Sequence, residues 1–378
     1  MNLPIICYHR IFIGVMRATR VTNKILNWIR PEIRALNAYH VADASGLVKL
    51  DAMENPYTLD ALTGHWSEVL ATAEINRYPD PSAAVLREKL SQVMAVPEGT
   101  ETVLGNGSDE LIQMLAMVVS GKDRCIMSFD PGFVMYKMIA EFVGMEYVGV
   151  PLDESFNIDM AATRAAIEKY QPAIIFIAYP NNPTANLFNE ASIEEILKIA
   201  PGLVVVDEAY HPFAQDSFMS RLPEYEQLLV MRTVSKMGLA GLRLGMLAGA
   251  PELIQQVDKV RLPYNINVLT QRAACSALEQ VVVLDEQATM IRQQREVMLK
   301  ALSDMAVVEA FPSRANFILF RLSGVDSGKV FESIRDQGVL IKNMNAQTGA
   351  LKNCLRVTVG QPEENTAFLA ALEKALAG

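Results

Sequence analysis

Lys236 has the surroundings expected of a reactive amine. It follows a predicted strand and precedes a glycine-rich bend that ends at Arg243. A lysine in an apolar bend loses its proton more readily than a solvated lysine, and an unprotonated amine can form an imine. The hydroxyls of Thr233 and Ser235 and the guanidinium of Arg243 are suited to a phosphate. Most lysines only solubilise a surface, but this phosphate-like company makes Lys236 a candidate for covalent chemistry.

Asp207 is a second candidate because it follows four apolar residues, Leu203 to Val206. Burial is expected there, and a buried carboxylate is costly without a cationic partner. A protonated pyridine nitrogen is one such partner, and contact between opposite charges typically moves a pKa by about 1 to 3 units. Read alone, the motif also fits an aspartate that caps a helix or joins a structural ion pair.

A glycine-rich loop from Leu104 to Glu110 ends a short strand and opens a helix with an apolar face. Glycines let the backbone approach an anion, and the free N–H groups of a first helical turn can hold a phosphate. The loop therefore predicts a phosphate site at the start of this helix. By itself it equally fits Ser108 or Asp109 acting only as a helix cap.

The region from Val103 to Ala250 is expected to position these candidates. Short β-branched runs alternate there with helix-period segments, which is typical of an α/β fold whose helices sandwich a mostly parallel central sheet. Ligands bind outside the carboxyl ends of strands in such sheets, so the polar residues that follow the strands are expected to share one crevice. The predicted strands are Cys125 to Phe129, Tyr147 to Val150, Ala173 to Ala178, Leu203 to Val206, Leu228 to Arg232 and Leu244 to Ala248.

The C-terminal part has a different pattern. It predicts a long polar helix, a few strands and a terminal helix near Glu364 to Leu376, as in a smaller α+β domain. Arg356 lies in one of these strands, where alternation places it opposite the apolar residues, although a surface arginine would fit equally. We predict an extension over residues 1–37, an N-terminal arm over 38–75, a large domain over 76–280 and a small domain over 281–378.

Composition argues against several classes of function. The net charge of -9 opposes binding to nucleic acid. The 4 cysteines and 4 histidines lack metal-ligand spacing, and the cysteines suit free thiols in a reducing compartment, so a cytoplasmic protein without a metal is predicted. No apolar run is long enough to cross a membrane. The basic segment before Asn37 is interpreted as a non-essential extension, with an organelle transit peptide as the alternative.

Several motifs together resemble those of the fold type I aminotransferases, enzymes that use pyridoxal 5′-phosphate. Within that group the order and spacing resemble the histidinol-phosphate aminotransferase family most closely, from about Asn37 to the C-terminus. The motifs are FDPGFVMY from Phe129, AYPNNPT from Ala178, VVVDEAY ending at Tyr210, RTVSK ending at Lys236, GLAGLRLG from Gly238, and CLRVTVG from Cys354.

The resemblance implies a role for each matching residue. Lys236 would hold the cofactor as a Schiff base and move the proton of the substrate Cα. Asp207 would pair with the pyridine nitrogen. Tyr210 and Asn182 would bond to the ring O3′, and Phe133 would stack on the ring. The implied phosphate cup consists of the backbone of Gly107, Ser108 and Asp109 with Ser235 and Arg243.

Further residues are implied at the edges of the site. Tyr78 resembles the tyrosine that reaches the phosphate from the other subunit, which implies an obligate homodimer. Arg356 matches the arginine that binds the anionic end of the substrate. Tyr39, Asn182 and Lys342 would complete the substrate site.

The sequence departs from the family pattern at four points. Lys342 stands where relatives often carry arginine, so a point charge replaces a bidentate phosphate contact. Arg243 follows Lys236 one residue sooner than in the commonest pattern, so the turn between them must differ. Met53 and Ala185 are also unusual, and we attach no functional meaning to either.

The predicted reaction is reversible transamination between histidinol phosphate and 2-oxoglutarate in L-histidine biosynthesis, with small-molecule substrates and no nucleic acid or membrane partner. An aromatic amino-acid aminotransferase and a phosphothreonine-type decarboxylase of the same fold are the alternatives. A non-catalytic sensor is a further alternative, but such proteins usually append a DNA-binding module, and the basic leader is too short for one.

Overall fold

The computed structural model describes residues 23–38, 41–59, 63–345 and 349–377. The chain divides into two units, Met1–Val41 and Ala42–Gly378. In the first unit, the described part contains two short helices, α1 (Asn23–Leu26) and α2 (Pro31–Ala35). α2 begins with a proline, whose fixed φ suits the first helical position. Tyr39 lies outside the described residues.

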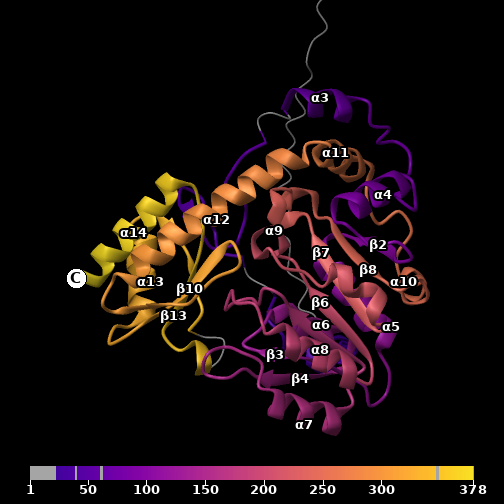
Figure 1. The fold of residues 1–378 in the computed structure, drawn as a ribbon, viewed down its shortest axis with the longest axis horizontal. Coiled ribbons are helices and arrows are strands. Elements are labelled where there is room, and N and C mark those ends of the chain that lie inside the picture. Colours follow the sequence, from indigo (N-terminus) through magenta and orange to yellow (C-terminus); the bar gives the residue numbers. More distant parts are fainter. Residues whose placement is uncertain (1–22, 39–40, 60–62, 346–348, 378) are drawn as a thin grey trace, which may run out of the picture. The chain divides into compact units, whose positions relative to one another are not determined.

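The second unit contains a seven-stranded sheet in the order β2-β8-β7-β6-β5-β3-β4 (Figure 1). β8 runs antiparallel to both of its neighbours, β2 and β7, whereas the other pairs of this sheet are parallel, so the predicted mostly parallel sheet is confirmed. All six predicted strands are present, each within one residue at either end. The strands are β2 (Glu101–Gly105), β3 (Cys125–Asp130), β4 (Glu146–Pro151), β5 (Ile174–Ala178), β6 (Leu203–Asp207), β7 (Leu228–Thr233) and β8 (Gly245–Gly249).

Helices cover both faces of this sheet. Along β5, Ile174 and Phe176 join a core with the helices of one face, while Ile175 and Ile177 join a core with the helices of the other. This explains why the strand is apolar throughout, because both of its faces are buried. Helices of the first face are α5 (Gly107–Val119), α6 (Val134–Val143) and α10 (Pro251–Asp258); those of the second are α4 (Ala84–Val93), α7 (Met160–Tyr170), α8 (Glu190–Ile199) and α11 (Val268–Leu278).

A separate four-stranded antiparallel sheet has the order β12-β13-β10-β9. Figure 1 shows it beside α13 and α14, with α12 running from this group toward α11. The long helix and the terminal helix are thus confirmed, whereas the domain boundaries stay a prediction. The elements are α12 (Val281–Ser303), β9 (Val308–Ala310), β10 (Phe317–Leu322), α13 (Ser327–Asp336), β12 (Lys342–Asn343), β13 (Cys354–Thr358) and α14 (Pro362–Ala377).

Short elements join these groups. β1 pairs in parallel with β11, which ties the segment before residue 50 to the C-terminal part. The short elements are β1 (Val48–Lys49), α3 (Thr63–Ala71), α9 (His211–Ala214), η2 (Met219–Glu224), η3 (Ser235–Met237), η4 (Ala240–Leu242), β11 (Val339–Leu340) and η5 (Gly349–Leu351).

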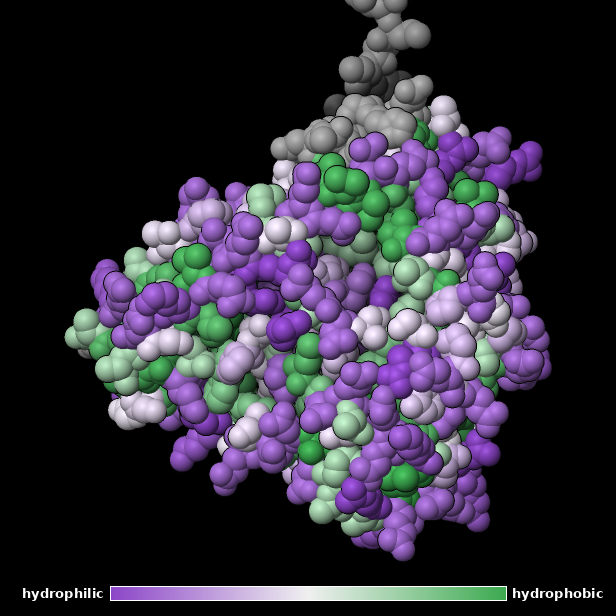
Figure 2. Space-filling model, viewed as in Figure 1, coloured by the Kyte–Doolittle hydropathy of each residue, from purple (hydrophilic) through white to green (hydrophobic). Residues whose placement is uncertain are grey.

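The surface in this view is mostly polar, with hydrophobic atoms gathered near α3 and α11 (Figure 2). Exposed apolar side chains of this region include Leu70 and Leu269. Within the described ranges, no helix is both long and apolar enough to span a bilayer. Nor do three or more His, Cys, Asp or Glu side chains of the described residues gather closely enough to bind a metal ion.

Candidate active site

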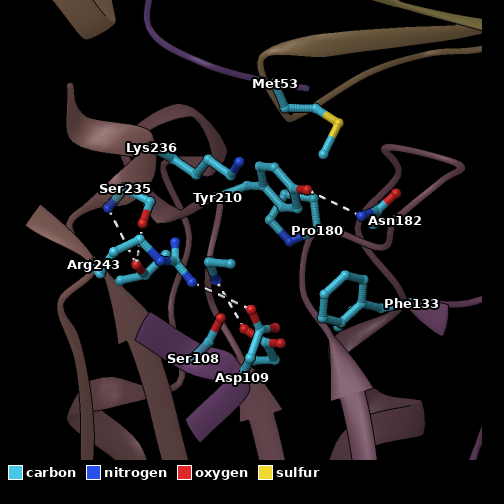
Figure 3. A pocket seen from close by; sticks show the side chains of 14 residues that line it. Met53, Ser108, Asp109, Phe133, Pro180, Asn182, Tyr210, Ser235, Lys236 and Arg243 are labelled. Carbon is cyan, nitrogen blue, oxygen red and sulfur yellow. Dashed lines mark hydrogen bonds and ion pairs between the residues drawn. The ribbon is translucent and has the colours of Figure 1, made fainter. Parts of the chain in front are cut away.

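The residues predicted to do chemistry meet in one pocket at the carboxyl ends of β5, β6 and β7 (Figure 3). Lys236 and Asp207 both face this cavity, although 29 positions separate them in the sequence. Figure 3 shows Arg243 and Ser235 on one side of it and Phe133 and Asn182 on the other. The lining residues are Met53, Ser108, Asp109, Phe133, Ala178, Pro180, Asn182, Asp207, Ala209, Tyr210, Thr233, Ser235, Lys236 and Arg243.

One end of the pocket is built to receive an anion. Helix α5 begins at Gly107, and Asn106 at the N-cap position makes no capping hydrogen bond through its side chain. The interpretation of Ser108 or Asp109 as the cap is therefore wrong, and N–H groups of the first turn have no capping side chain. Gly107 has a φ of +78°, and a Cβ there would lie 2.6 Å from Arg243 Nη2. Glycine thus lets the guanidinium approach the helix N-terminus, where backbone and side chain together favour a phosphate.

A hydrogen-bond network that sequence reasoning missed fixes the loop before α5. The Glu110 carboxylate accepts hydrogen bonds from Asn106 N at 2.7 Å and from Asn265 Nδ2 at 2.9 Å. Asn265 Nδ2 also donates to Leu104 O at 3.0 Å. Asn265 lies between α10 and α11, and no local pattern shows that it contacts a residue 155 positions earlier.

The hydroxyls of Thr233 and Ser235 lie beside this anion site. Thr233 Oγ1 and Ser235 Oγ are 2.9 Å apart, and Thr233 Oγ1 donates to Leu244 O at 3.0 Å. Ser235 N donates to Thr233 Oγ1 at 3.1 Å. These contacts hold both side chains at the end of β7, where they line the pocket with Arg243.

Lys236 points into the pocket, so its interpretation as a surface lysine is wrong. Its Nζ donates to Ala52 O at 3.2 Å and lies 5.8 Å from the centre of the Tyr210 ring. Burial, and then the nearby charge of Arg356, lower the pKa of the Lys236 amine to about 8. An amine with this pKa loses its proton more readily than a solvated lysine, as an imine-forming amine requires.

The shorter spacing between Lys236 and Arg243 is accommodated by two tight turns, η3 and η4. Gly238 between them has a φ of +115°, and Arg243 itself has a φ of +47°. Both values lie in the left-handed region, which is costly for a residue other than glycine. Across these turns the side chains of Lys236 and Arg243 both face the same cavity.

Asp207 is buried, with 4% of its surface exposed. Its Oδ2 accepts a hydrogen bond from Tyr136 Oη at 2.7 Å and its Oδ1 accepts one from Ala209 N at 3.1 Å. The part of the chain that the structure describes contains no ion pair to Asp207, and the N-cap of the following helix is Tyr210. The cap and ion-pair interpretations of Asp207 are therefore wrong. Burial raises the pKa of this carboxyl to about 7, which a cationic ligand would lower again.

A chain of hydrogen bonds links Arg356 to Tyr210. Arg356 Nη1 donates to Asn182 Oδ1 at 2.6 Å, and Asn182 Nδ2 donates to Tyr210 Oη at 3.1 Å. Arg356 Nη2 donates to Asp51 O at 3.1 Å, and only 7% of the arginine is exposed. The surface interpretation of Arg356 is therefore wrong. Its neighbour Leu355 packs in the C-terminal core, as the alternation predicted.

Lys342 lies directly across the sheet from Arg356, because β12 pairs with β13 in that register. Residues paired in this way share one face of a sheet, so two cationic side chains stand together. Tyr78 does not line the pocket of its own chain. It is 80% exposed and stacks on Tyr264, with ring centroids 4.4 Å apart.

Met53 lines the pocket although sequence reasoning gave it no function. Its φ of +53° is left-handed, and two hydrogen bonds hold its backbone. Met53 N donates to Thr358 Oγ1 at 3.0 Å, and Met53 O accepts from Asn316 Nδ2 at 3.0 Å. Nothing in the residue type shows this backbone conformation, which depends on partners more than 260 positions away. Ala185, the other unusual residue, is also left-handed, with a φ of +65°.

The profile of the family described as aminotransferase class I and II matches residues 45–372. The chain belongs to this family. It is 53% identical to histidinol-phosphate aminotransferase 2 of Nitrosococcus oceani, over 93% of this chain and 98% of that protein. It is 52% identical to histidinol-phosphate aminotransferase 2 of Cupriavidus pinatubonensis, over 92% and 96% of the two chains. The fold resembles the histidinol-phosphate aminotransferase of Sinorhizobium meliloti solved with pyridoxal 5′-phosphate, with a TM-score of 0.81 at 21% identity over 96% and 99% of the chains.

This class I and II aminotransferase depends on pyridoxal 5′-phosphate, and the pocket fits that cofactor. The cradle at Gly107, where a Cβ would collide with Arg243, suits the phosphate. Asp207 offers a carboxylate without a cationic partner among the described residues, and Lys236 offers an amine of lowered pKa. One pocket thus holds an acceptor for a cationic nitrogen, an amine for a carbonyl carbon and donors for a phosphate.

Proposed function

We propose that the chain catalyses reversible transamination between histidinol phosphate and 2-oxoglutarate, and that it acts in L-histidine biosynthesis. The observation that carries this proposal is a second positively charged site, separate from Arg243. Arg356 binds Asn182, which Figure 3 shows across the pocket from Arg243, and Lys342 stands beside Arg356. One cationic end suits the cofactor phosphate, and the other suits the anionic end of a substrate. The names and high identity of the two sequence relatives support the same substrate.

The proposed roles follow from position. Pyridoxal phosphate supplies an electron sink for the carbon from which a proton is removed. Lys236 attaches the cofactor and accepts the proton of the substrate Cα on its Nζ, whose pKa of about 8 suits both tasks. Asp207 holds the ring nitrogen, Tyr210 and Asn182 hold the ring O3′, and Phe133 covers the ring face. The proposed phosphate cup is the backbone of Gly107, Ser108 and Asp109 with Thr233, Ser235 and Arg243.

The substrate site is proposed to include Arg356, Lys342 and Asn182, with Tyr39 as a further phosphate contact. Arg356 is already oriented by Asn182 and by the Asp51 carbonyl, so little side-chain entropy is lost when it binds an anion. Lys342 then adds a second charge from the neighbouring strand. The carboxylate of glutamate and the phosphate of histidinol phosphate are both anions that this pair can receive.

A cytoplasmic homodimer with shared active sites is part of the proposal. Tyr78 is proposed to reach the cofactor phosphate of the partner subunit, and its 80% exposure supports such a contact. The hydrophobic surface near α3 and α11 in Figure 2 supports a partner on this side of the unit. The free cysteines Cys125, Cys275 and Cys354 suit a reducing compartment.

A single-turnover comparison tests the proposed reaction. Purified enzyme loaded with pyridoxal phosphate is mixed with histidinol phosphate, histidinol, phenylalanine or phosphothreonine, and the loss of the cofactor's absorption band is followed. We expect histidinol phosphate to react at least about a hundredfold more efficiently than histidinol, because a charged phosphate contact is worth roughly 1.5 to 3 kcal/mol for each hydrogen bond. Histidinol is a matched control, since it lacks only the phosphate.

Two further measurements complete the test. The wild-type enzyme is expected to turn over and Lys236→Ala to abolish that turnover. A non-catalytic sensor would show no turnover even as the wild-type protein. Carbon dioxide release from phosphothreonine identifies a decarboxylase instead. The proposal fails if phenylalanine reacts faster than histidinol phosphate, or if histidinol and its phosphate react equally well.

A further inference from the structure

Tyr136 is a buried residue of α6 to which the proposed mechanism gives no role. Its side chain has no exposed surface, and its hydroxyl donates a hydrogen bond of 2.7 Å to Asp207 Oδ2. Its ring stacks on Phe176 of β5, with centroids 4.7 Å apart, and meets Phe133 edge to face at 5.4 Å. Tyr136 therefore contacts two residues that line the pocket, Asp207 and Phe133.

The first turn of α6 places both aromatic residues. Phe133 is the N-cap of this helix, and Tyr136 N donates to Phe133 O at 3.2 Å. Residues three apart on a helix lie on the same side, so one turn brings both the Phe133 ring and the Tyr136 hydroxyl to the pocket. The stack on Phe176 then holds the Tyr136 ring against the sheet.

The Tyr136 hydroxyl favours the ionised form of Asp207. Burial raises the pKa of the Tyr136 hydroxyl well above its usual range, so this group keeps its proton and remains a donor. A donor to a carboxylate stabilises its charge, and this hydrogen bond lowers the Asp207 pKa while burial raises it. The bond also fixes the rotation of the carboxylate, since Oδ1 is held by Ala209 N.

The other charged groups near Asp207 act in the opposite direction. Asp109 of α5 and Glu208, the next residue along the chain, are both acidic, and both raise the Asp207 pKa. The hydrogen bonds from Tyr136 and Ala209 are the contacts that lower it. Without the Tyr136 hydroxyl, Asp207 would hold a proton more readily and would be a weaker partner for a cation.

We propose that Tyr136 is a positioning residue that keeps Asp207 ionised and aimed at the ring nitrogen of the cofactor. This inference rests on the proposed function, in which Asp207 binds that nitrogen. Phenylalanine would keep the contacts of the ring with Phe133 and Phe176 and would remove only the hydroxyl. Tyr136→Phe therefore separates the hydrogen bond from the packing.

The test measures the binding of two ligands to full-length enzyme from which the cofactor has been removed. One ligand is pyridoxamine 5′-phosphate, whose amine cannot form an imine with Lys236. The other is its 1-deaza analogue, in which a C–H replaces the ring nitrogen. Dissociation constants from fluorescence titration give the preference of each protein for the nitrogen. We expect Tyr136→Phe to reduce this preference about tenfold, as for loss of a hydrogen bond to a charged group, with little change in affinity for the deaza ligand.

Tyr147→Phe is the matched control, because it removes a hydroxyl that donates to another carboxylate, Asp130, at 3.2 Å. It should keep the preference of the wild-type enzyme. If Tyr136→Phe keeps that preference, or weakens both ligands equally, the Tyr136 inference is overturned while the Asp207 assignment survives. If the wild-type enzyme shows no preference for the nitrogen, the proposed role of Asp207 fails, and the inference fails with it.

Discussion

Asp207 and Glu208 are neighbouring carboxylates at the end of β6, and both are buried. Glu208 has no exposed surface, and its Oε2 accepts hydrogen bonds from Arg232 Nε at 2.9 Å and Ser217 Oγ at 2.9 Å. Its Oε1 accepts from Phe218 N at 2.6 Å. Asp207 receives its hydrogen bonds from Tyr136 and Ala209, which are both neutral donors.

The difference shows how one strand serves two purposes. Successive side chains of a strand point to opposite sides, so adjacent acids meet different neighbours. The charge of Glu208 is neutralised by Arg232 within the fold, which makes this pair structural. The charge of Asp207 is left for a ligand, at a cost in stability that the bound cofactor offsets. We therefore expect substitutions of these two residues to have opposite effects on stability and on the binding of the cofactor.

Glu208→Gln is expected to have the largest effect on stability. It would leave Arg232 charged and buried without its counter-ion, and breaking a buried pair in this way costs about 3 to 5 kcal/mol. Urea unfolding of the wild-type and variant proteins measures the loss. A variant as stable as the wild-type enzyme would show that Glu208 has no structural role.

Asp207→Asn should stabilise the cofactor-free enzyme above neutral pH. The pKa of Asp207 is raised from 3.8 to about 7, so the folded state binds the proton more tightly than the unfolded state. The folded form of the wild-type enzyme therefore loses stability as the pH rises from about 4 to 7, by roughly 4 kcal/mol for a pKa raised from 3.8 to about 7. Asparagine carries no charge and avoids this loss.

The measurement is urea unfolding of the cofactor-free proteins at pH 4.5 and pH 8. The variant should be the more stable protein at pH 8, and the difference should shrink toward zero at the lower pH. With pyridoxal phosphate bound the order should reverse, because only the wild-type enzyme can pair with the ring nitrogen. An advantage of the same size at both pH values would show that the Asp207 charge is not its cause.

The sequence predicts that Asp207 is buried at the end of a strand, but it does not predict which partners surround the two acids. The four apolar residues before Asp207 predict a buried strand, and the position of the acid at its end predicts a place in the crevice. Both predictions depend only on local periodicity and on the geometry of a parallel sheet. The sequence does not show which of the two acids has a cation, because Arg232 and Tyr136 belong to other elements of the sheet and its helices.

Other features escape the sequence for the same reason. Asn265 fixes the loop at Asn106 through Glu110, and its residue type is an ordinary one for a loop. The left-handed backbone of Met53 depends on Thr358 and Asn316, which are distant in the sequence. Tyr136 lies inside a motif that carries the family resemblance, but its neighbours along the helix do not show that its hydroxyl contacts Asp207.

Two cations of the proposed substrate site, Arg356 and Lys342, differ in how their side chains are held. Arg356 is held by Asn182 and the Asp51 carbonyl, whereas no hydrogen bond or ion pair of Lys342 is found among the described residues.

Lys342→Arg should have the smallest effect of these substitutions. We expect KM for histidinol phosphate to fall about threefold to tenfold, because a guanidinium binds a phosphate through two hydrogen bonds. Steady-state kinetics with histidinol phosphate and with histidinol measure it. We expect kcat to stay unchanged and histidinol to show no gain. An equal gain for both substrates would mean that Lys342 does not contact the phosphate, which would leave Arg356 as its proposed partner.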